Sequence, residues 1–368
     1  MLKMTKTSVP ISVAGLLIIP LMFADLGAAC SRILWNTNTQ AVLVARSMDW
    51  SAPFGDRLVL NPRGIHMQGW PGESPATWIS RYGSITVVPY AFSLAFLKSL
   101  DSGSNAARNL DPLADGSSEG MNEKGLAAHL LALEATAYEK RDTGKPRVHP
   151  ARLLRYVLDN FSTVKDAVAA LQTIQVVPLV GETVYPQHMA LDDATGDSAI
   201  IEFLDGRMEI HHGREHTVLT NDPPYPDQQE NLSRYAGFGG VREELPGGVE
   251  SLDRFVRAAT FLKTLPEPKD RTEAVAFLSS VIRNVSVPFG AVYHSLPGSP
   301  TYPTWWTAVS DLKNRTFFFH MTRSLNALWV HLDKVDFAAG SPRRVLDPGR
   351  NDLAGDVTNR FEPVPAGG

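Results

Sequence analysis

The chain contains a single cysteine, Cys30, among its 368 residues. This excludes a disulfide framework and any zinc or iron–sulfur site built from cysteines. The fold must therefore be held by a hydrophobic core, and the 43% hydrophobic content is enough to build one. The formal net charge is −4 and the chain has no long Lys/Arg run, which argues against non-specific nucleic-acid binding.

Residues 1–29 have the pattern of a secretory signal peptide. Two lysines precede an apolar run over residues 9–23, and Gly27-Ala28-Ala29 supplies the small side chains that a signal peptidase reads. Two prolines interrupt the run, which is too short for a stable membrane span, and no later stretch reaches about 18 apolar residues. We expect residues 1–29 to be removed and the mature chain to be periplasmic or secreted.

Cleavage after Ala29 would make Cys30 the first residue, and three roles compete for it. As a lipoprotein, the chain would carry lipid on Cys30, but the residue three places earlier is Gly27 and Leu26 lies one place too early. A buried structural cysteine is the second role, although chain ends are rarely packed deeply. In the third, the thiol acts beside its own α-amine, whose ordinary pKa of about 7.7–8.0 allows it to take the thiol's proton.

The residues after Cys30 predict a β-hairpin. Two runs of strand formers flank Asn36-Thr37-Asn38-Thr39, a turn-forming tetrad. A hairpin centred near Asn38 places Arg46 roughly opposite Cys30, with Asp49 just beyond. A guanidinium beside a thiol lowers the thiol pKa from about 8.5, and a carboxylate near the α-amine can orient it. On spacing alone, a surface Arg–Asp pair fits equally well.

Several motifs follow in order along the mature chain. They are Cys30 with ARSMDW at 45–50, GMNEKGLA at 120–127, HTVLTNDP at 216–223, SLDRFVRA at 251–258, and the stretches 286–288 and 307–314. In this combination the chain resembles the choloylglycine hydrolase family, the N-terminal-nucleophile amidases that include penicillin V acylases and bile salt hydrolases. The resemblance implies one catalytic domain over residues 30–346, and residues 347–368 read as a loose tail.

The resemblance also implies a fold and a set of roles. The fold would be α+β, a four-layer αββα sandwich of two antiparallel sheets, and strand-like and helical runs are segregated along the chain as such a sandwich requires. Cys30 would be the nucleophile and its amine the base, Arg46 and Arg254 would flank the sulfur, and Asp49 would hold the amine. The Asn221 amide would donate to the oxyanion, an interaction typically worth about 2.7–4 kcal/mol of barrier.

The local sequence suits these positions, with departures from the family pattern. Asn221 ends a β-rich run just before Pro223-Pro224, and Arg254 lies in the first turn of a helix that Ser251 is expected to cap. The second oxyanion-hole asparagine of many members falls near Ala132, which leaves only a backbone contribution there. The stretch between Asn221 and Arg254 is short compared with the assembly hairpin of many members, so whether the chain forms a homo-oligomer stays open.

The substrate region should be apolar with few polar groups. Met48, Trp50 and Phe54 follow the hairpin and resemble the family's substrate loop, although for each residue taken singly ordinary packing is the favoured explanation. The sequence supplies no nucleotide-binding motif, and the adjacent His211 and His212 would point to opposite faces of a strand, so no metal or cofactor is expected.

The expected function is hydrolysis of a linear amide C–N bond in a small-molecule acyl amide. Penicillin V and N-acyl-homoserine lactones are the leading substrates. Conjugated bile salts, and a non-catalytic lipoprotein with Cys30 lipidated, are the alternatives.

Overall fold

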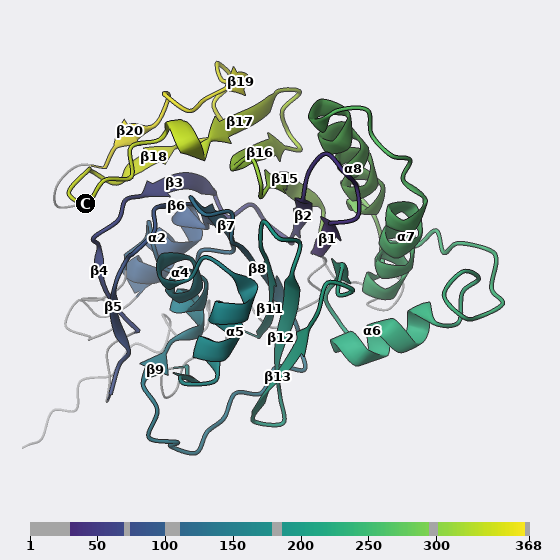
Figure 1. Ribbon diagram of the computed structural model, residues 1–368, viewed down its shortest axis with the longest axis horizontal. Coiled ribbons are helices and arrows are strands. Elements are labelled where there is room, and N and C mark those ends of the chain that lie inside the picture. Colours follow the sequence, from purple (N-terminus) through teal and green to yellow (C-terminus); the bar gives the residue numbers. More distant parts are fainter. Residues whose placement is uncertain (1–29, 70–73, 100–110, 179–185, 294–300, 365–368) are drawn as a thin grey trace, which may run out of the picture.

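Two antiparallel sheets stacked between helices form the computed structural model, which describes residues 30–69, 74–99, 111–178, 186–293 and 301–364 (Figure 1). The expected signal peptide lies outside the described residues. Within these residues, sheet 1 has the order β14 (Val218–Leu219), β1 (Ser31–Trp35), β2 (Leu43–Asp49), β15 (Thr304–Asp311), β16 (Thr316–Met321), β17 (Ala327–His331) and β19 (Gly355–Asp356). Its neighbours pair antiparallel except for β17 with β19.

Sheet 2 contains strands from the region between β2 and β14, together with two short strands near the C-terminus. Its order is β13 (Arg207–His212), β12 (Ser198–Leu204), β11 (Gln187–Asp192), β8 (Ala127–Ala132), β7 (Glu119–Asn122), β6 (Ser84–Val88), β3 (Arg57–Asn61), β18 (Arg344–Leu346) and β20 (Glu362–Pro363). Short ribbons pair β4 (His66–Gln68) with β5 (Thr77–Ile79) and β9 (Arg147–Val148) with β10 (Gln175–Val176).

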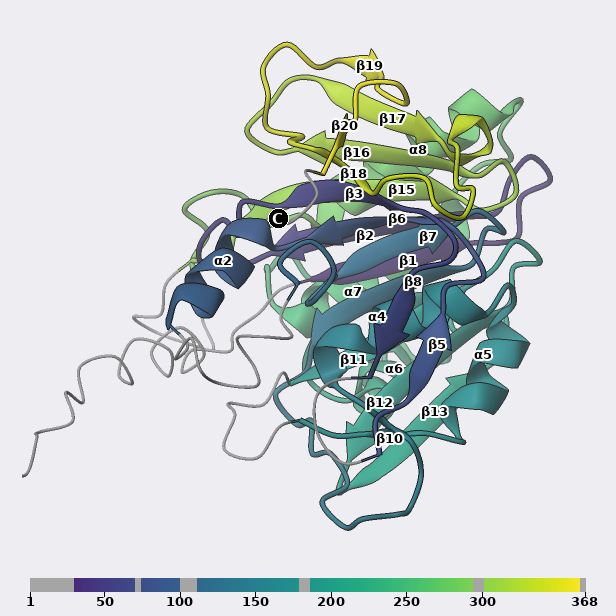
Figure 2. The same ribbon diagram turned by 90° about the vertical axis from the view of Figure 1, so that its left-hand side faces the viewer.

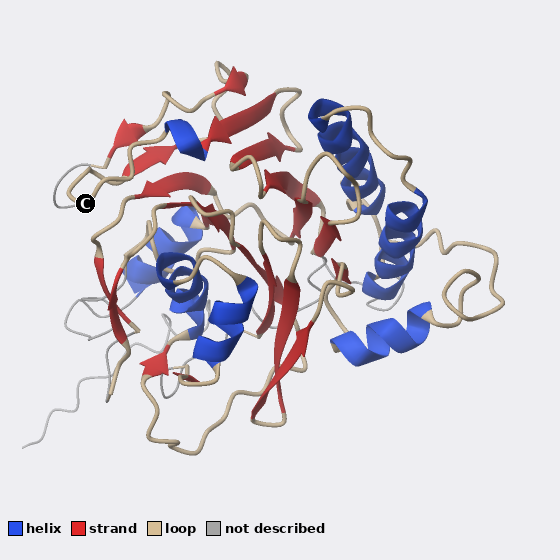
Figure 3. Ribbon diagram, viewed as in Figure 1, coloured by secondary structure: helices blue, strands red, loops and turns tan. Residues whose placement is uncertain are grey.

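Helices cover the outer face of each sheet (Figure 3). Sheet 2 curves around α4 (Pro150–Asn160) and α5 (Val164–Leu171), while α7 (Ser251–Thr264) and α8 (Arg271–Val285) pack on sheet 1 (Figure 1). The apolar periodicity of the sequence predicts these four helices over residues 150–160, 164–174, 252–265 and 272–285. The described residues also contain α2 (Tyr90–Ser99), α6 (Tyr225–Leu232) and the 3₁₀ turn η2 (Leu332–Lys334). The order helix, sheet, sheet, helix confirms the predicted αββα architecture.

Burial on both faces explains the composition of the central strands. Every residue of β1, β2 and β15 is buried, because each strand has sheet 2 on one side and helices on the other. Such strands read as nearly continuous apolar runs instead of alternating ones. Polar residues that do occur there, such as Arg32, Arg46 and Asp49, lie in the interior and need partners.

The C-terminal segment is packed, which corrects the expectation of a loose tail. Leu353, Val357 and Phe361 are buried in the main core. The strand β19 pairs with β17 and β20 pairs with β18, so the described part of the segment, up to Val364, contributes an edge to both sheets (Figure 2). Its many turn residues connect very short strands, which local composition does not distinguish from disorder. No helix in the described ranges is long and apolar enough to cross a bilayer.

Candidate active site

The β1–β2 hairpin places Cys30 in the interior, at the end of sheet 1. The register pairs Ser31 with Ser47 and Arg32 with Arg46, so its continuation sets Cys30 opposite Met48. The sequence predicted Arg46 at that position. The two-residue error arises in the turn, where the Asn38 Oδ1 accepts from the backbone N–H groups of residues 40 and 41 and moves the turn along the chain. Residues two apart share a face, so Arg46 still lies on the side of Cys30.

The Cys30 thiol is buried, with 2% of the residue exposed. Its Sγ lies 3.8 Å from the Arg46 Nη2, 3.7 Å from the Met48 Sδ and 4.0 Å from the Asp49 carbonyl oxygen. Burial raises the pKa of the thiol, and the Arg46 guanidinium opposes that rise, with a smaller opposing effect from Arg254. Arg46 is therefore the cation placed to stabilise a thiolate.

Arg46 is fixed by groups from the second sheet and from β15. Its Nη2 donates to the Leu130 carbonyl oxygen at 2.5 Å, and its guanidinium lies 5.0 Å from the centre of the Trp306 ring. The Nε is 3.8 Å from Glu119 Oε2. These contacts hold the positive charge in one place beside the sulfur.

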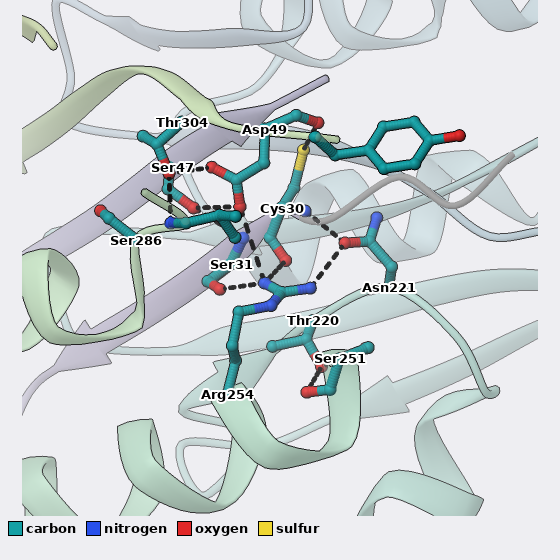
Figure 4. Close-up of polar contacts among 12 residues, drawn as sticks. Cys30, Ser31, Ser47, Asp49, Thr220, Asn221, Ser251, Arg254, Ser286 and Thr304 are labelled. Carbon is teal, nitrogen blue, oxygen red and sulfur yellow. Dashed lines mark hydrogen bonds and ion pairs between the residues drawn. The ribbon is translucent and has the colours of Figure 1, made fainter. Parts of the chain in front are cut away.

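Asn221 binds the backbone of Cys30 (Figure 4). It follows β14 and precedes a cis Asp222–Pro223 bond. The Cys30 backbone nitrogen donates to the Asn221 Oδ1, and the Asn221 Nδ2 donates to the Ala132 carbonyl oxygen at 2.8 Å. An amide group has two hydrogens, so one is engaged by Ala132 and one can serve an oxyanion.

Ala132 therefore enters the site through its backbone, as the sequence predicted, but by its carbonyl. The N–H and C=O of one antiparallel strand residue point to the same side. The Ala132 N–H thus points toward the Asn221 edge of β8, where a second oxyanion donor would have to lie.

Arg254 binds the main chain of Cys30, and its charge lowers the thiol pKa less than that of Arg46 does. Its Nη1 donates to the Cys30 carbonyl oxygen at 2.7 Å and to the Ser31 Oγ at 2.5 Å, and its Nη2 lies 3.3 Å from Asn221 Oδ1. The guanidinium reaches these acceptors from the first turn of α7, where it is fully buried (Figure 4). Its effect is to orient the residue that carries the thiol.

The sequence predicted that Ser251 caps α7, and this prediction is wrong. Glu250 occupies the N-cap position, and the Ser251 Oγ donates to the Thr220 Oγ1 at 2.9 Å. This bond ties the start of α7 to the residue before Asn221. Ser251 therefore connects the two elements that supply Arg254 and Asn221.

Asp49 lies beside the cysteine backbone, where its carboxylate accepts from the Thr304 Oγ1 at 2.5 Å and the Ser47 Oγ at 3.1 Å. The Arg254 Nη1 is 3.7 Å away. Burial raises the pKa of Asp49 to about 6, against the opposing charge of Arg254. The hydrogen bond from the Cys30 nitrogen goes to Asn221, whereas Asp49 reaches the chain through Ser47, which accepts from the Ser31 N–H at 3.1 Å.

Ser47 and Thr304 were not predicted. Thr304 comes from a strand more than 250 residues away in sequence, and no local pattern marks it. Ser47 lies inside the ARSMDW motif, between Arg46 and Asp49. The one sequence signal for Ser47 and Thr304 is that each is a polar residue within a strand expected to be buried.

Aromatic side chains pack together in the segment that follows Met48 and around it. The ring centres of Trp50 and Phe54 are 5.4 Å apart, and those of Phe54 and Phe92 are also 5.4 Å apart. The Trp305 Nε1 donates to the Trp50 carbonyl oxygen at 2.8 Å, and Phe289 lies 5.3 Å from Trp305. Of the predicted substrate residues, Met48 thus lies against the sulfur and Trp50 packs on Phe54, with further aromatic residues from α2, from β15 and from the segment before β15.

No group of three or more His, Cys, Asp or Glu side chains suited to a metal ion occurs among the described residues. His211 instead packs against Tyr225 at 5.1 Å between ring centres, and the His216 Nδ1 lies 2.9 Å from the Tyr225 hydroxyl. His211 and His216 therefore belong to an aromatic cluster around Tyr225, whereas His212 pairs with Asp197.

Two stacked sheets between helix layers, with a thiol at the end of the central hairpin, define a sandwich of the N-terminal-nucleophile hydrolase class. The family model of linear amide C–N hydrolases, choloylglycine hydrolase family, matches residues 30–347, and the chain belongs to this family. It is therefore an amidohydrolase acting on linear amides.

Relatives and solved structures agree with this assignment. The chain is 36% identical over 365 residues to a penicillin V acylase of Pectobacterium atrosepticum. The alignment covers 91% of this chain and 90% of the relative. It is 28% identical over 247 residues to a bile salt hydrolase/transferase of Clostridium perfringens, covering 59% of this chain and 74% of the relative. The structure of penicillin V acylase from Agrobacterium tumefaciens superposes with a TM-score of 0.77 at 32% identity, covering 91% and 98% of the two chains.

Proposed function

We propose that this protein is an exported acylase that uses the thiol and α-amine of a mature N-terminal Cys30 to hydrolyse amides with an apolar acyl group. The observation that carries this proposal is the convergence on Cys30. Arg46 lies beside the sulfur, Asn221 accepts from the backbone nitrogen, and Arg254 holds the carbonyl. The nitrogen that cleavage after Ala29 would turn into an amine is therefore already bound within the site.

The reaction follows from these positions. The α-amine takes the thiol proton, and the thiolate attacks the amide carbon to form a tetrahedral intermediate. The second Asn221 hydrogen and the Ala132 N–H donate to the oxyanion. The α-ammonium then protonates the leaving nitrogen, the C–N bond breaks, and an acyl thioester remains on Cys30. A water molecule, deprotonated by the same amine, hydrolyses the thioester and restores the thiol.

The aromatic side chains after Met48 and the relatives both support this substrate class. Side chains such as Phe54 and Trp305 favour an aromatic or long aliphatic acyl group. The 36% identity to a penicillin V acylase over most of both chains favours penicillin V, with N-acyl-homoserine lactones as the second acyl amide. Conjugated bile salts remain the alternative that the bile salt hydrolase relative supports.

The contacts of Cys30 argue against lipidation. A diacylglyceryl group on Sγ would have to occupy the space in which Arg46 Nη2 and Met48 Sδ lie within 3.8 Å of the sulfur. The Gly27-Ala28-Ala29 cleavage pattern supports instead a periplasmic or secreted enzyme with a free thiol.

The Cys30→Ser variant tests the nucleophile. We expect it to fold, with an unchanged circular dichroism spectrum, and to lose nearly all penicillin V hydrolysis. N-terminal sequencing and intact mass of the secreted wild-type protein are the companion measurements. Retained activity in the variant, or a mature protein that does not begin at Cys30, would contradict the mechanism. Rates on penicillin V, an acyl-homoserine lactone and a conjugated bile salt then rank the substrates.

A further inference from the structure

Two buried hydroxyl groups contact the Asp49 carboxyl, one at each of its oxygens. The Thr304 Oγ1 lies 2.5 Å from Asp49 Oδ1, and the Ser47 Oγ lies 3.1 Å from Asp49 Oδ2 (Figure 4). All three residues are at most 1% exposed, and they come from the paired strands β2 and β15. The proposed reaction gives neither hydroxyl a role.

A backbone N–H group fixes the direction of each hydroxyl. The Val287 N–H donates to the Thr304 Oγ1 at 2.7 Å, and the Ser31 N–H donates to the Ser47 Oγ at 3.1 Å. Each hydroxyl keeps its own single hydrogen to donate. Within the described ranges, the Asp49 carboxyl is the one acceptor that lies within hydrogen-bond distance of these two hydroxyls.

This arrangement is satisfied by an ionised Asp49. A protonated carboxyl would have to donate to one of the two hydroxyl oxygens, and the hydrogen of that hydroxyl would then be buried without an acceptor, which is costly. An ionised carboxylate accepts from both hydroxyls and leaves no hydrogen unpaired. The 2.5 Å contact with Thr304 also lies in the range of a hydroxyl that donates to a carboxylate.

Burial works against this ionised form. It raises the pKa of Asp49 to about 6, and the charge of Arg254 and the hydrogen bonds from Thr304 and Ser47 limit the rise. Without one of the hydroxyls, the pKa of Asp49 would therefore move toward neutral pH or above it. The other ionisable and charged groups that face Asp49 come from α7, from β2, from the residue before β1 and from the segment after α8: Arg254, Arg46, Cys30 and Tyr293.

We propose that Ser47 and Thr304 are positioning residues that hold Asp49 as a carboxylate at neutral pH, each through a hydroxyl whose direction a backbone N–H fixes. The proposal rests on the proposed function for what the carboxylate does, which is to stabilise the α-ammonium that the Cys30 amine becomes when it takes the thiol proton. The charge of Asp49 itself does not depend on any substrate.

The titration of Asp49 is measured without substrate, as the free energy of unfolding of a protein minus that of its Asp49→Asn counterpart. For the wild type this difference falls as pH rises to about 6 and is level above. For Thr304→Val, which keeps the shape but loses the hydroxyl, we expect the fall to continue for about one to two further pH units, because the folded state binds the Asp49 proton more tightly. The acceptor lost to the Val287 N–H is lost in both proteins of the pair and cancels.

Two further variants separate the hydroxyl from the shape of the side chain. Ser47→Ala should extend the fall in the same direction as Thr304→Val. Thr304→Ser keeps the hydroxyl and should restore the wild-type titration. The acid limb of kcat/KM for penicillin V should move up in Thr304→Val by the same number of pH units and return in Thr304→Ser, whereas a purely structural role would lower the rate without moving this limb.

Ser310→Ala is the matched control. Ser310 lies on β15 like Thr304 and is fully buried, but its Oγ has no hydrogen-bond partner among the described residues. We expect this variant to leave both the stability titration and the acid limb unchanged.

The proposal would be overturned by an Asp49 titration that stays at the wild-type pH in Thr304→Val and Ser47→Ala, or by an equal shift in Thr304→Ser. Ser47→Ala decides the question if Thr304→Val fails to fold. The expected shifts in stability combined with no amide hydrolysis by the wild type would refute the proposed function alone.

Discussion

Asp49 provides a quantitative test of the electrostatics of the site. The carboxyl is completely buried, and burial raises its pKa to about 6, whereas an aspartate in an unfolded chain titrates near about 3.9. The folded state therefore binds this proton more tightly than the unfolded state. The resulting stabilisation is complete below about pH 4 and is lost as pH rises through about 6. Two pH units correspond to a loss of about 3 kcal/mol.

The Asp49→Asn variant removes this titration. We expect the free energy of unfolding of the wild type, minus that of the variant, to fall by about 3 kcal/mol between pH 4 and pH 7 and to stay level above. Urea denaturation followed by circular dichroism at several pH values measures it. The absolute offset between the proteins includes the lost Arg254 contact at 3.7 Å, so the slope with pH is the quantity to compare.

Asp205→Asn is the control for loss of one carboxylate. It is exposed in a turn at φ 50°, a conformation that asparagine adopts readily. The reasoning would be refuted if the wild-type minus Asp49→Asn difference in the free energy of unfolding rose with pH, or if it matched the difference for the control at every pH. Either result would mean that burial does not raise the pKa of Asp49.

Three further perturbations follow from the same contacts. Arg46→Gln should raise the midpoint of the Cys30 thiolate titration by about one to two pH units, because the cation nearest to the sulfur is removed; an unchanged ultraviolet titration would exclude Arg46 as the thiolate's counter-ion. Asn221→Ala should lower kcat by about 10²–10³, the effect of losing one oxyanion donor, and a loss confined to KM would contradict that role. Truncation after Asp347 should lower the urea midpoint markedly, because it removes Leu353, Val357 and Phe361 from the core, whereas a loose tail would leave it unchanged.

The sequence predicts the long periodic elements and the motif residues well. The helices α4, α5, α7 and α8 start or end within three residues of their predicted bounds, because each has an apolar stripe that packs on a sheet. Cys30, Arg46, Asp49, Asn221 and Arg254 do converge in the structure. A motif is a set of positions that tertiary contacts hold together, so its residues meet even where the local register is predicted wrongly.

The sequence does not predict which atoms of the site residues are in contact with each other. Arg254 was expected to flank the sulfur, and its guanidinium donates to the Cys30 carbonyl oxygen, a contact between a helix and a distant strand that no local pattern specifies. Asp49 and Thr304 meet through strand pairing between β2 and β15, which depends on a register shift that no local pattern encodes. Side chains across sheets, such as His129 and Arg46, are related only by the stacking of the two sheets.

The contacts of Cys30 explain how a residue proposed to start the mature chain can be a rigid nucleophile. Terminal residues are poorly ordered unless other elements hold them. Here each polar atom of Cys30 has a partner from a different element: the nitrogen from the segment after β14, the carbonyl oxygen from α7, and the sulfur from β2. Three anchors from three directions fix its position and orientation without a preceding peptide bond. Loss of that bond on cleavage would therefore supply an amine without loosening the thiol, which is the condition for both groups to act on one substrate carbonyl.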